Sequence, residues 1–84
     1  MSTPHMRQVR EALTAAIAES LNEGFYGTHI EISELNTQGE IRSVYGSFRI
    51  AYLFDIDPRR KGKFEAQLDK NLNVINLKIQ EETR

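Results

Sequence analysis

The segment DPRRKGKF, residues 57–64, places four cations within five positions, and such a cluster could bind anionic groups. The four are Arg59, Arg60, Lys61 and Lys63. Cations at one site can neutralise the phosphates of a nucleic acid or pair with the carboxylates of an acidic protein. Charged side chains at a hairpin tip also keep sheet edges from associating. The sequence therefore supports two interpretations of this segment, an anion-binding surface and a solvated turn.

Few other side chains have a spacing that could support catalysis or metal binding. The only histidines, His5 and His29, are far apart and lie in no metal-binding motif. Asp55 and Asp57 could together hold a hard cation, but the neighbouring cations can neutralise both carboxylates. No serine stands in a nucleophile motif, and no glycine-rich phosphate loop occurs. We therefore expect no catalytic residue, no metal site and no cofactor, and leave open acid–base catalysis by an exposed side chain.

Composition and charge restrict the class of protein further. The 84 residues suit a single domain, residues 1–84, with a net charge of −1 and a sequence pI of about 6.1. Dedicated nucleic-acid-binding domains are typically basic, with a pI above about 9. The sequence has no cysteine, no apolar run of the roughly 18 residues that span a membrane, and no signal peptide. We expect a cytoplasmic protein without a membrane partner.

The first part of the chain, about residues 4–23, has the pattern of an amphipathic helix. Thr3 is suited to cap its N-terminus, Pro4 to be its first residue, and Gly24 to end it in the left-handed conformation. Apolar residues recur at steps of three and four, which predicts one buried stripe. The stripe comprises Met6, Val9, Leu13, Ala16, Ile17 and Leu21.

The rest of the chain alternates apolar and polar residues, which predicts strands. We expect them at about 28–35, 40–57, 62–69 and 72–80. Gly46 should mark a bulge or bend, and a turn from Asp57 through Pro58 should place Gly62 at positive φ. One apolar face should carry Val44, Phe48, Ile50, Tyr52, Phe54 and Ile56, then Phe64, Ala66 and Leu68, then Ile75, Leu77 and Ile79. The predicted fold class is α+β, one N-terminal helix packed on a four-stranded antiparallel meander sheet.

The other face of the predicted second strand is also partly apolar. Ala51 and Leu53 lie there beside Tyr45, Arg49 and Asp55. A single helix can cover only one face of a sheet, so we expect a homodimer through the second face or through a sheet edge. A monomer with a partly apolar sheet is the alternative, because much of any protein surface is apolar.

The stretch GSFRIAYLFDIDPRR, within residues 46–60, resembles the core strand pair of RelE- and HigB-type toxins, particularly a phage-derived group. The matching positions are Phe48, Arg49, Ile50, Tyr52, Phe54, Asp55, Arg59 and Arg60. The resemblance implies a small α+β ribonuclease that cleaves messenger RNA and is neutralised by an antitoxin, with Arg49, Arg59 and Arg60 facing RNA. The chain departs from these toxins in its single helix, its acidic balance and its C-terminal segment.

Together these observations favour a small non-enzymatic binding or regulatory module that acts through protein–protein contacts as a homodimer. The candidate surface for a partner or a phosphate comprises Tyr45, Arg49, Tyr52, Arg59, Arg60, Lys61 and Lys63. The first alternative is a RelE/HigB-like ribonuclease that binds RNA through the basic hairpin. The second is a structural subunit of a larger assembly.

Overall fold

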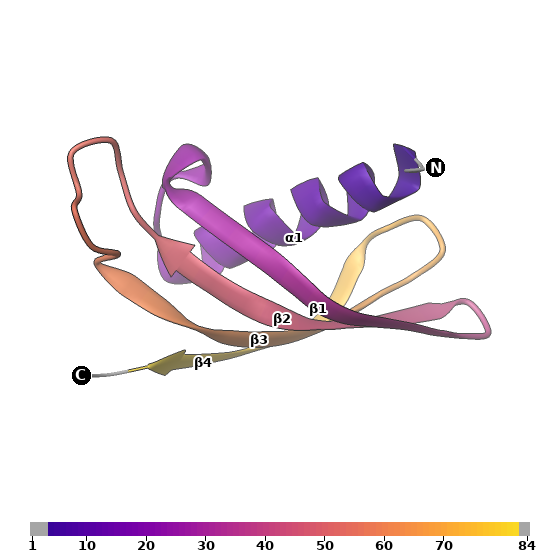
Figure 1. The fold of residues 1–84 in the computed structure, drawn as a ribbon. Helices are drawn as coiled ribbons and strands as arrows, with labels where there is room; N and C mark the ends of the chain where they lie inside the picture. The colour runs from indigo at the N-terminus through magenta and orange to yellow at the C-terminus, as the bar shows by residue number, and fades with distance from the viewer. Residues whose placement is uncertain (1–3, 83–84) are drawn as a thin grey trace.

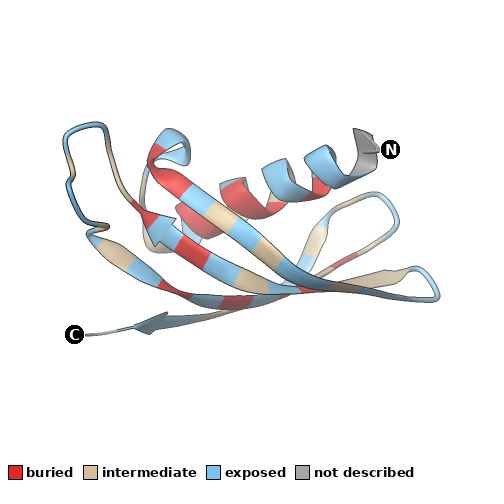
Figure 2. Ribbon diagram, viewed as in Figure 1, coloured by how far each residue is buried: buried red, intermediate tan, exposed pale blue. Residues whose placement is uncertain are grey.

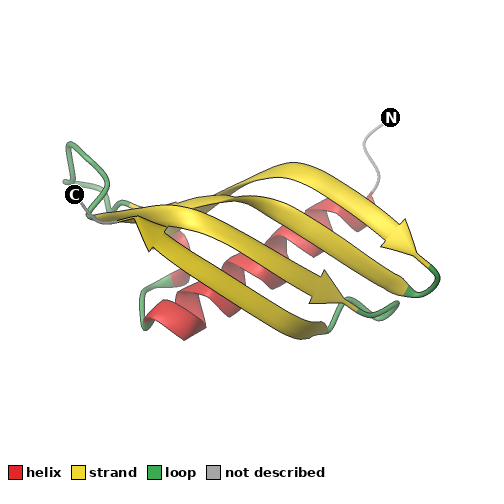
Figure 3. Cartoon of the chain, turned by 90° about the horizontal axis from the view of Figure 1, so that it is seen from below, coloured by secondary structure: helices red, strands yellow, loops and turns green. Residues whose placement is uncertain are grey.

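The computed structural model describes residues 4–82, and the predicted cap at Thr3 lies outside them. The elements are α1 (Pro4–Leu21), the 3-10 turn η1 (Phe25–Gly27), β1 (Thr28–Gln38), β2 (Ile41–Ile50), β3 (Arg60–Leu68) and β4 (Val74–Glu82). The strands form one antiparallel sheet in the order β1-β2-β3-β4, and α1 lies across one face of it (Figures 1 and 3). The predicted fold class is confirmed.

The core lies between α1 and the helix-facing side of the two central strands (Figure 2). Val9, Leu13 and Ile17 of the predicted stripe are fully buried, whereas Met6 is exposed near the start of the helix. They pack with Val44, Phe48, Ile50, Phe64, Ala66 and Leu68, as the alternation predicted. Thr14 is buried among apolar residues because its hydroxyl donates to the Arg10 carbonyl, at 2.7 Å.

The helix ends differently from the prediction. Its last residue is Leu21, and Asn22 takes the left-handed conformation, with φ of 58°. Asparagine is one of the few residues with a side chain that visits this region readily. Gly24 has φ of −76° and is extended, so the predicted left-handed stop at Gly24 is wrong.

The sheet contains its first irregularity in β1, opposite Gly46. The register of β1 and β2 shifts between Ile32 and Glu34, which leaves Ser33 as the extra residue of a bulge. A Cβ added at Gly46 would lie 2.1 Å from the main-chain oxygen of Glu31. The predicted bulge at Gly46 therefore belongs to the partner strand, and the glycine is required because that strand approaches closely.

The second strand is shorter than predicted. β2 ends at Ile50, where Arg60 already pairs with it, and residues 51–59 leave the sheet as a loop. The prediction of one strand over 40–57 is wrong for its last part, and Phe54 and Ile56 are exposed instead of facing the core. The predicted turn at Gly62 is also wrong. Gly62 lies inside β3, where a Cβ would come within 2.3 Å of the Gln80 main-chain oxygen.

The outer face of the sheet, away from α1, is mostly polar. Its side chains include His29, Glu31, Ser33, Ser43, Tyr45, Ser47, Arg49, Lys61, Lys63, Glu65, Gln67, Asn76, Lys78 and Gln80. The expected apolar residues Ala51 and Leu53 lie in the loop, so the argument for a dimer through this face does not hold. A register shift between Gln67 and Leu68 displaces Ile75, which is half-exposed although a core position was predicted. In the described part of the chain, no helix has the length and apolar character needed to cross a membrane.

Candidate functional site

The loop of residues 51–59, which we call the apolar finger, presents three large apolar side chains to solvent. Leu53, Phe54 and Ile56 have 89%, 92% and 98% of their surface exposed. The finger projects past the end of the sheet, on the side of α1 (Figure 1). Single exposed apolar residues are ordinary, but a contiguous group marks a surface that another molecule covers. Burying each of these side chains would contribute roughly 1.5–3 kcal/mol.

Asp55 folds the finger into a defined turn. Its Oδ2 accepts the Tyr52 N–H at 2.8 Å, and its own N–H donates to the Tyr52 carbonyl at 2.9 Å. Both carboxylate oxygens also accept from Arg59, through Nε and Nη2, each at 3.0 Å. The hydrogen bonds from Arg59 and from the Tyr52 main chain lower the pKa of Asp55 below its usual value. The carboxylate is therefore ionised and holds both ends of the turn.

Tyr52 anchors the base of the finger to the segment that follows α1. Its hydroxyl donates to Glu23 Oε1 at 2.8 Å and accepts the Gly24 N–H, also at 2.8 Å. The Arg59 guanidinium lies over the ring, 4.9 Å from its centroid. A Cβ at Gly27 would lie 2.1 Å from the Tyr52 ring, so the ring packs directly on the main chain of η1.

Arg60 completes the anchor at the first residue of β3. Its Nε and Nη2 donate to the two carboxylate oxygens of Glu81, both at 2.8 Å. Its Nη1 donates to the Leu21 carbonyl at 3.0 Å and to Glu23 Oε2 at 3.1 Å. The pKa of Glu23 is lowered by the hydrogen bond from Tyr52 and then by that from Arg60, and Arg60 also lowers the pKa of Glu81. The finger thus projects from a base that is held by hydrogen bonds and ion pairs.

Two aromatic residues of η1 lie at the same end of the molecule (Figure 1). Tyr26 is 91% exposed and Phe25 is partly exposed. Their rings meet edge to face, with centroids 5.4 Å apart. Aromatic rings that are already ordered lose little conformational entropy on binding, so they are effective contact residues. We group Phe25 and Tyr26 with the finger as one apolar end of the molecule.

The structure divides the predicted surface into two parts. Tyr52, Arg59 and Arg60 lie at the base of the finger, where both arginines form ion pairs. The other four predicted residues, Tyr45, Arg49, Lys61 and Lys63, lie on the outer face of the sheet. The sequence interpretation missed Leu53, Phe54 and Ile56 as site residues, because their alternation is also the pattern of a strand. Asp55 was the available signal, since aspartate favours turns through hydrogen bonds of its side chain to the nearby main chain.

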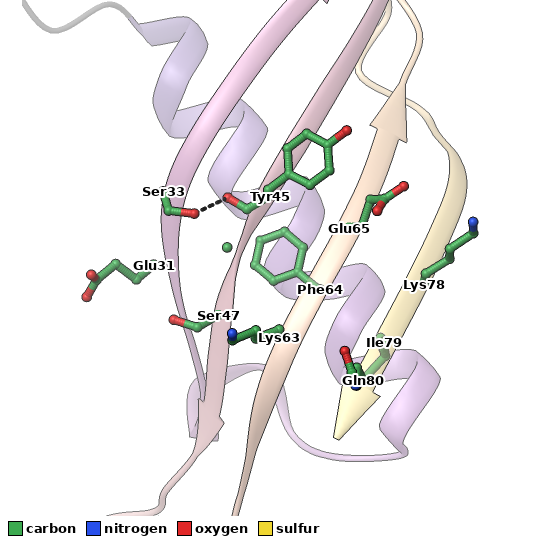
Figure 4. A pocket seen from close by; sticks show the side chains of 11 residues that line it. Glu31, Ser33, Tyr45, Ser47, Lys63, Phe64, Glu65, Lys78, Ile79 and Gln80 are labelled. Atoms are coloured by element: carbon green, nitrogen blue, oxygen red, sulfur yellow. Dashed lines mark hydrogen bonds between the residues drawn. The ribbon is translucent and has the colours of Figure 1, made fainter. Parts of the chain in front are cut away.

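A shallow depression of about 700 Å³ lies over the outer face (Figure 4). Gly46, Phe64 and Ile79 are among the residues that line it. Ser33 donates to the Tyr45 carbonyl at 3.1 Å within it. The charged and hydroxyl-bearing side chains around it are Glu31, Ser33, Tyr45, Ser47, Lys63, Glu65 and Lys78.

The direction of the pKa shifts of four carboxylates indicates that these groups stabilise the fold. Glu23, Asp55, Asp69 and Glu81 all have a lowered pKa, and each shift has hydrogen bonds to arginine, tyrosine or the main chain as its leading cause. A general acid at neutral pH needs the opposite shift. Within residues 4–82, no three histidine, aspartate or glutamate side chains come together in a way that could hold a metal ion.

Comparison with known proteins gives no relative. No protein-family model, curated protein or solved structure matches the chain.

Proposed function

We propose that this protein is a non-enzymatic binding module that acts through protein–protein contacts, and that the apolar finger is its contact element. The observation that carries the proposal is the near-complete exposure of Leu53, Phe54 and Ile56 on a loop whose base is fixed. A fixed loop has already lost its conformational freedom, so little further entropy opposes binding. The apolar side chains then gain the free energy of leaving water.

The occupant we propose is a second copy of this chain. A groove of about 430 Å³ runs between α1 and the start of β4, and apolar side chains from both elements line it. They are Ala16, Val74, Ile75 and Leu77, and the polar residues Glu19, Ser20 and Asn76 complete the lining. The molecule therefore carries both an apolar projection and a groove that is apolar in part. When the finger of each copy enters the groove of the other, the two contacts are identical and the assembly closes as a twofold dimer.

The size of the contact favours this arrangement over a contact between two fingertips. A stable interface of standard size buries about 800 Å² on each partner. Three side chains alone supply less than that, since a large apolar residue buries about 150–250 Å² at most. A reciprocal exchange uses the finger and the groove of each copy and so includes the additional surface of α1 and β4.

Sedimentation velocity over a range of protein concentrations tests the proposal. We expect a concentration-dependent dimer that the double variant Leu53→Asp, Phe54→Asp converts to a monomer. Ile75→Asp in the groove should also weaken the dimer, because both sides of the contact are needed. Met6→Asp is the matched control for Ile75→Asp: it places the same single charge at an exposed apolar residue outside the finger and groove, and the dimer should persist.

A monomer at all concentrations would exclude the second copy as the occupant. A dimer that persists in both the finger and the groove variants would exclude this interface.

The ribonuclease alternative rests on the resemblance described above. The ion pairs of Arg59 with Asp55 and of Arg60 with Glu23 and Glu81 do not favour it, because these arginines would have to release their partners to reach RNA. It predicts growth arrest on expression that Arg49→Ala or Arg59→Ala relieves. Normal growth of cells that express the intact chain would contradict it.

A further inference from the structure

Three cations lie next to one another on the outer face of the sheet. Arg49 of β2 and Lys61 of β3 are direct cross-strand partners, and Lys63 lies on the same face, two residues after Lys61. The Cα atoms of the three residues are thus roughly 5–8 Å apart, from the spacing of paired strands and the rise per residue. All three residues are exposed. The three cations are therefore close enough for one ligand to contact all of them.

None of these cations is neutralised within the part of the chain that the structure describes. The ion pairs there involve Arg59, Arg60 and Lys70, and none involves Arg49, Lys61 or Lys63. Like charges directly opposite each other destabilise a sheet. The same face shows the stabilising alternative, since Glu65 opposes Lys78. Arg49 and Lys61 therefore repel each other in the free protein, while Glu82 opposes Lys61 on its other side, and an anionic ligand would relieve the repulsion.

A hydroxyl donor adjoins the cations. Ser47 is the direct cross-strand partner of Lys63, and both side chains lie at one end of the outer-face depression (Figure 4). Ser47 also precedes Arg49 by two residues, so the two side chains share the outer face. Arginine can bind a phosphate with two parallel hydrogen bonds, lysine adds a point charge, and serine adds a neutral donor. The donor set suits a tetrahedral oxyanion.

The residues around the cluster limit the size of the ligand. Glu31 is the β1 partner of Ser47, Glu65 follows Lys63 by two residues, and Glu82 is the β4 partner of Lys61. A long polyanion would place its neighbouring phosphates beside these carboxylates, where repulsion opposes binding. A compact group of charge near −2 can lie between the cations and farther from these carboxylates than a long polyanion can, and a phosphomonoester carries that charge at neutral pH.

We propose that Arg49, Lys61 and Lys63, together with Ser47, form a binding site for a single phosphomonoester group. The site lies on the sheet face and uses none of the residues of the finger or the groove. It is therefore independent of the dimer proposed above. A phosphomonoester can come from a phosphorylated side chain of another protein or from a free phosphate ester.

Titration followed by amide NMR tests the site and separates the two sources. The probes are a short phosphoserine peptide, the same peptide without phosphate, inorganic phosphate, and a single-stranded RNA oligonucleotide without a terminal phosphate. We expect saturable shifts at residues 47–49 and 61–63 with the phosphopeptide and with inorganic phosphate, and none with the unphosphorylated peptide. A phosphopeptide that binds at least tenfold more tightly than inorganic phosphate assigns the ligand to a protein, and equal affinities assign it to a free ester.

The triple variant Arg49→Gln, Lys61→Gln, Lys63→Gln should lower phosphate affinity at least tenfold. The matched control, Arg7→Gln, Arg10→Gln, Lys70→Gln, changes the net charge equally at exposed residues elsewhere and should bind as the unmodified protein does. The cluster variant should also unfold cooperatively at a urea concentration similar to that of the unmodified protein, because loss of the repulsion between Arg49 and Lys61 is offset by loss of the attraction of Lys61 to Glu82. This second measurement shows that a loss of binding is not a loss of folding.

Three results would each overturn the proposal. The first is the absence of saturable shifts at these residues with either phosphate probe. The second is an equal loss of affinity in the cluster variant and its control. The third is tighter binding of the RNA oligonucleotide than of the phosphomonoesters, which would assign the cations to a polyanion.

Discussion

Arg60 Nη1 donates to the main-chain carbonyl of Leu21 at 3.0 Å, and this bond joins the first residue of β3 to the last residue of α1. The last carbonyls of a helix have no partner inside the helix, so an arginine from elsewhere can satisfy one of them and also favours the negative end of the helix dipole. The same guanidinium holds Glu23 and Glu81. One side chain therefore fastens the end of the helix to two strands of the sheet.

Replacement of Arg60 should destabilise the protein. Arg60→Met keeps much of the apolar stem but leaves Glu23, Glu81 and the Leu21 carbonyl without this donor. We expect the free energy of unfolding to fall by about 1–2 kcal/mol, a value reduced for the partial exposure of these groups. Urea denaturation measures it, and Arg7→Met, at an exposed residue, should change it by less than about 0.5 kcal/mol. Equal effects of the two variants would show that the network contributes nothing.

Four hydrogen-bonded carboxylates, two of them in this network, make stability dependent on pH. Glu23, Asp55, Asp69 and Glu81 have lower pKa values in the folded protein than in the unfolded chain. Between the two values the unfolded state binds more protons, so stability rises with pH. The contribution is complete above the unfolded values of about 4 and is lost as pH falls through the folded values.

Urea midpoints measured from pH 7 to pH 2.5 should therefore be flat at first and then fall below about pH 4.5. Arg60→Met should reduce the steepness of the fall, because Glu23 and Glu81 lose the donor that lowers their pKa. If the urea midpoint of Arg60→Met fell as steeply at low pH as that of the unmodified protein, Arg60 would not be the cause of the lowered pKa values.

Two glycine substitutions should distinguish the destabilisation caused by a steric clash from that caused by an unfavourable backbone conformation. A Cβ at Gly46 would collide with the Glu31 main-chain oxygen, which belongs to a paired strand and cannot move aside alone. Gly39 has φ of 64° and nothing near its missing Cβ, so alanine there carries only the conformational cost. We expect Gly46→Ala to cost about 2–3 kcal/mol or more and Gly39→Ala about 1–2 kcal/mol. The order of the two thermal midpoints checks this.

Residues of the apolar stripe of α1 should differ in how much they contribute to the free energy of unfolding. Leu13 is fully buried, and Leu13→Ala should cost about 2–5 kcal/mol through lost burial and a cavity. Met6 has the same place in the sequence pattern but is exposed, so Met6→Ala should change stability by less than about 0.5 kcal/mol. Chemical denaturation of both variants, with unchanged m-values, measures the difference. Similar losses for the two would mean that the helix is covered in solution along its whole length.

Most of the fold could be predicted because its elements have clear periodicity. Val9, Leu13 and Ile17 indicated the helix face, and the alternation around Phe48 and Phe64 indicated the sheet face. The same alternation continues from Tyr52 to Ile56 without a strand. There the deciding interactions are the turn closed by Asp55 and the register that pairs Arg60 with Ile50, and neither changes the apolar pattern.

The candidate site was less predictable because its partners are distant in sequence. The cations of residues 59–63 were visible as a group, but Arg60 binds Leu21, which is 39 residues earlier in the chain. Arg59 and Arg60 consequently lie in ion pairs, whereas Lys61 and Lys63 alternate onto the outer face. The bond from the Gly24 N–H to the Tyr52 hydroxyl is another such long-range contact.

The order of the elements along the chain also determines when the core can form during synthesis. The stripe of α1 is made first, but the side chains that bury it extend through Leu68 of β3, which follows Ile17 by 51 residues. At a translation rate of 5–20 residues per second, synthesis from Ile17 to Leu68 takes roughly 3–10 s, and the apolar face of the helix stays unburied during that time. A nascent chain that stops before β3 exposes this stripe to chaperones and proteases. The helix that is synthesised first is therefore stabilised only after both central strands have left the ribosome.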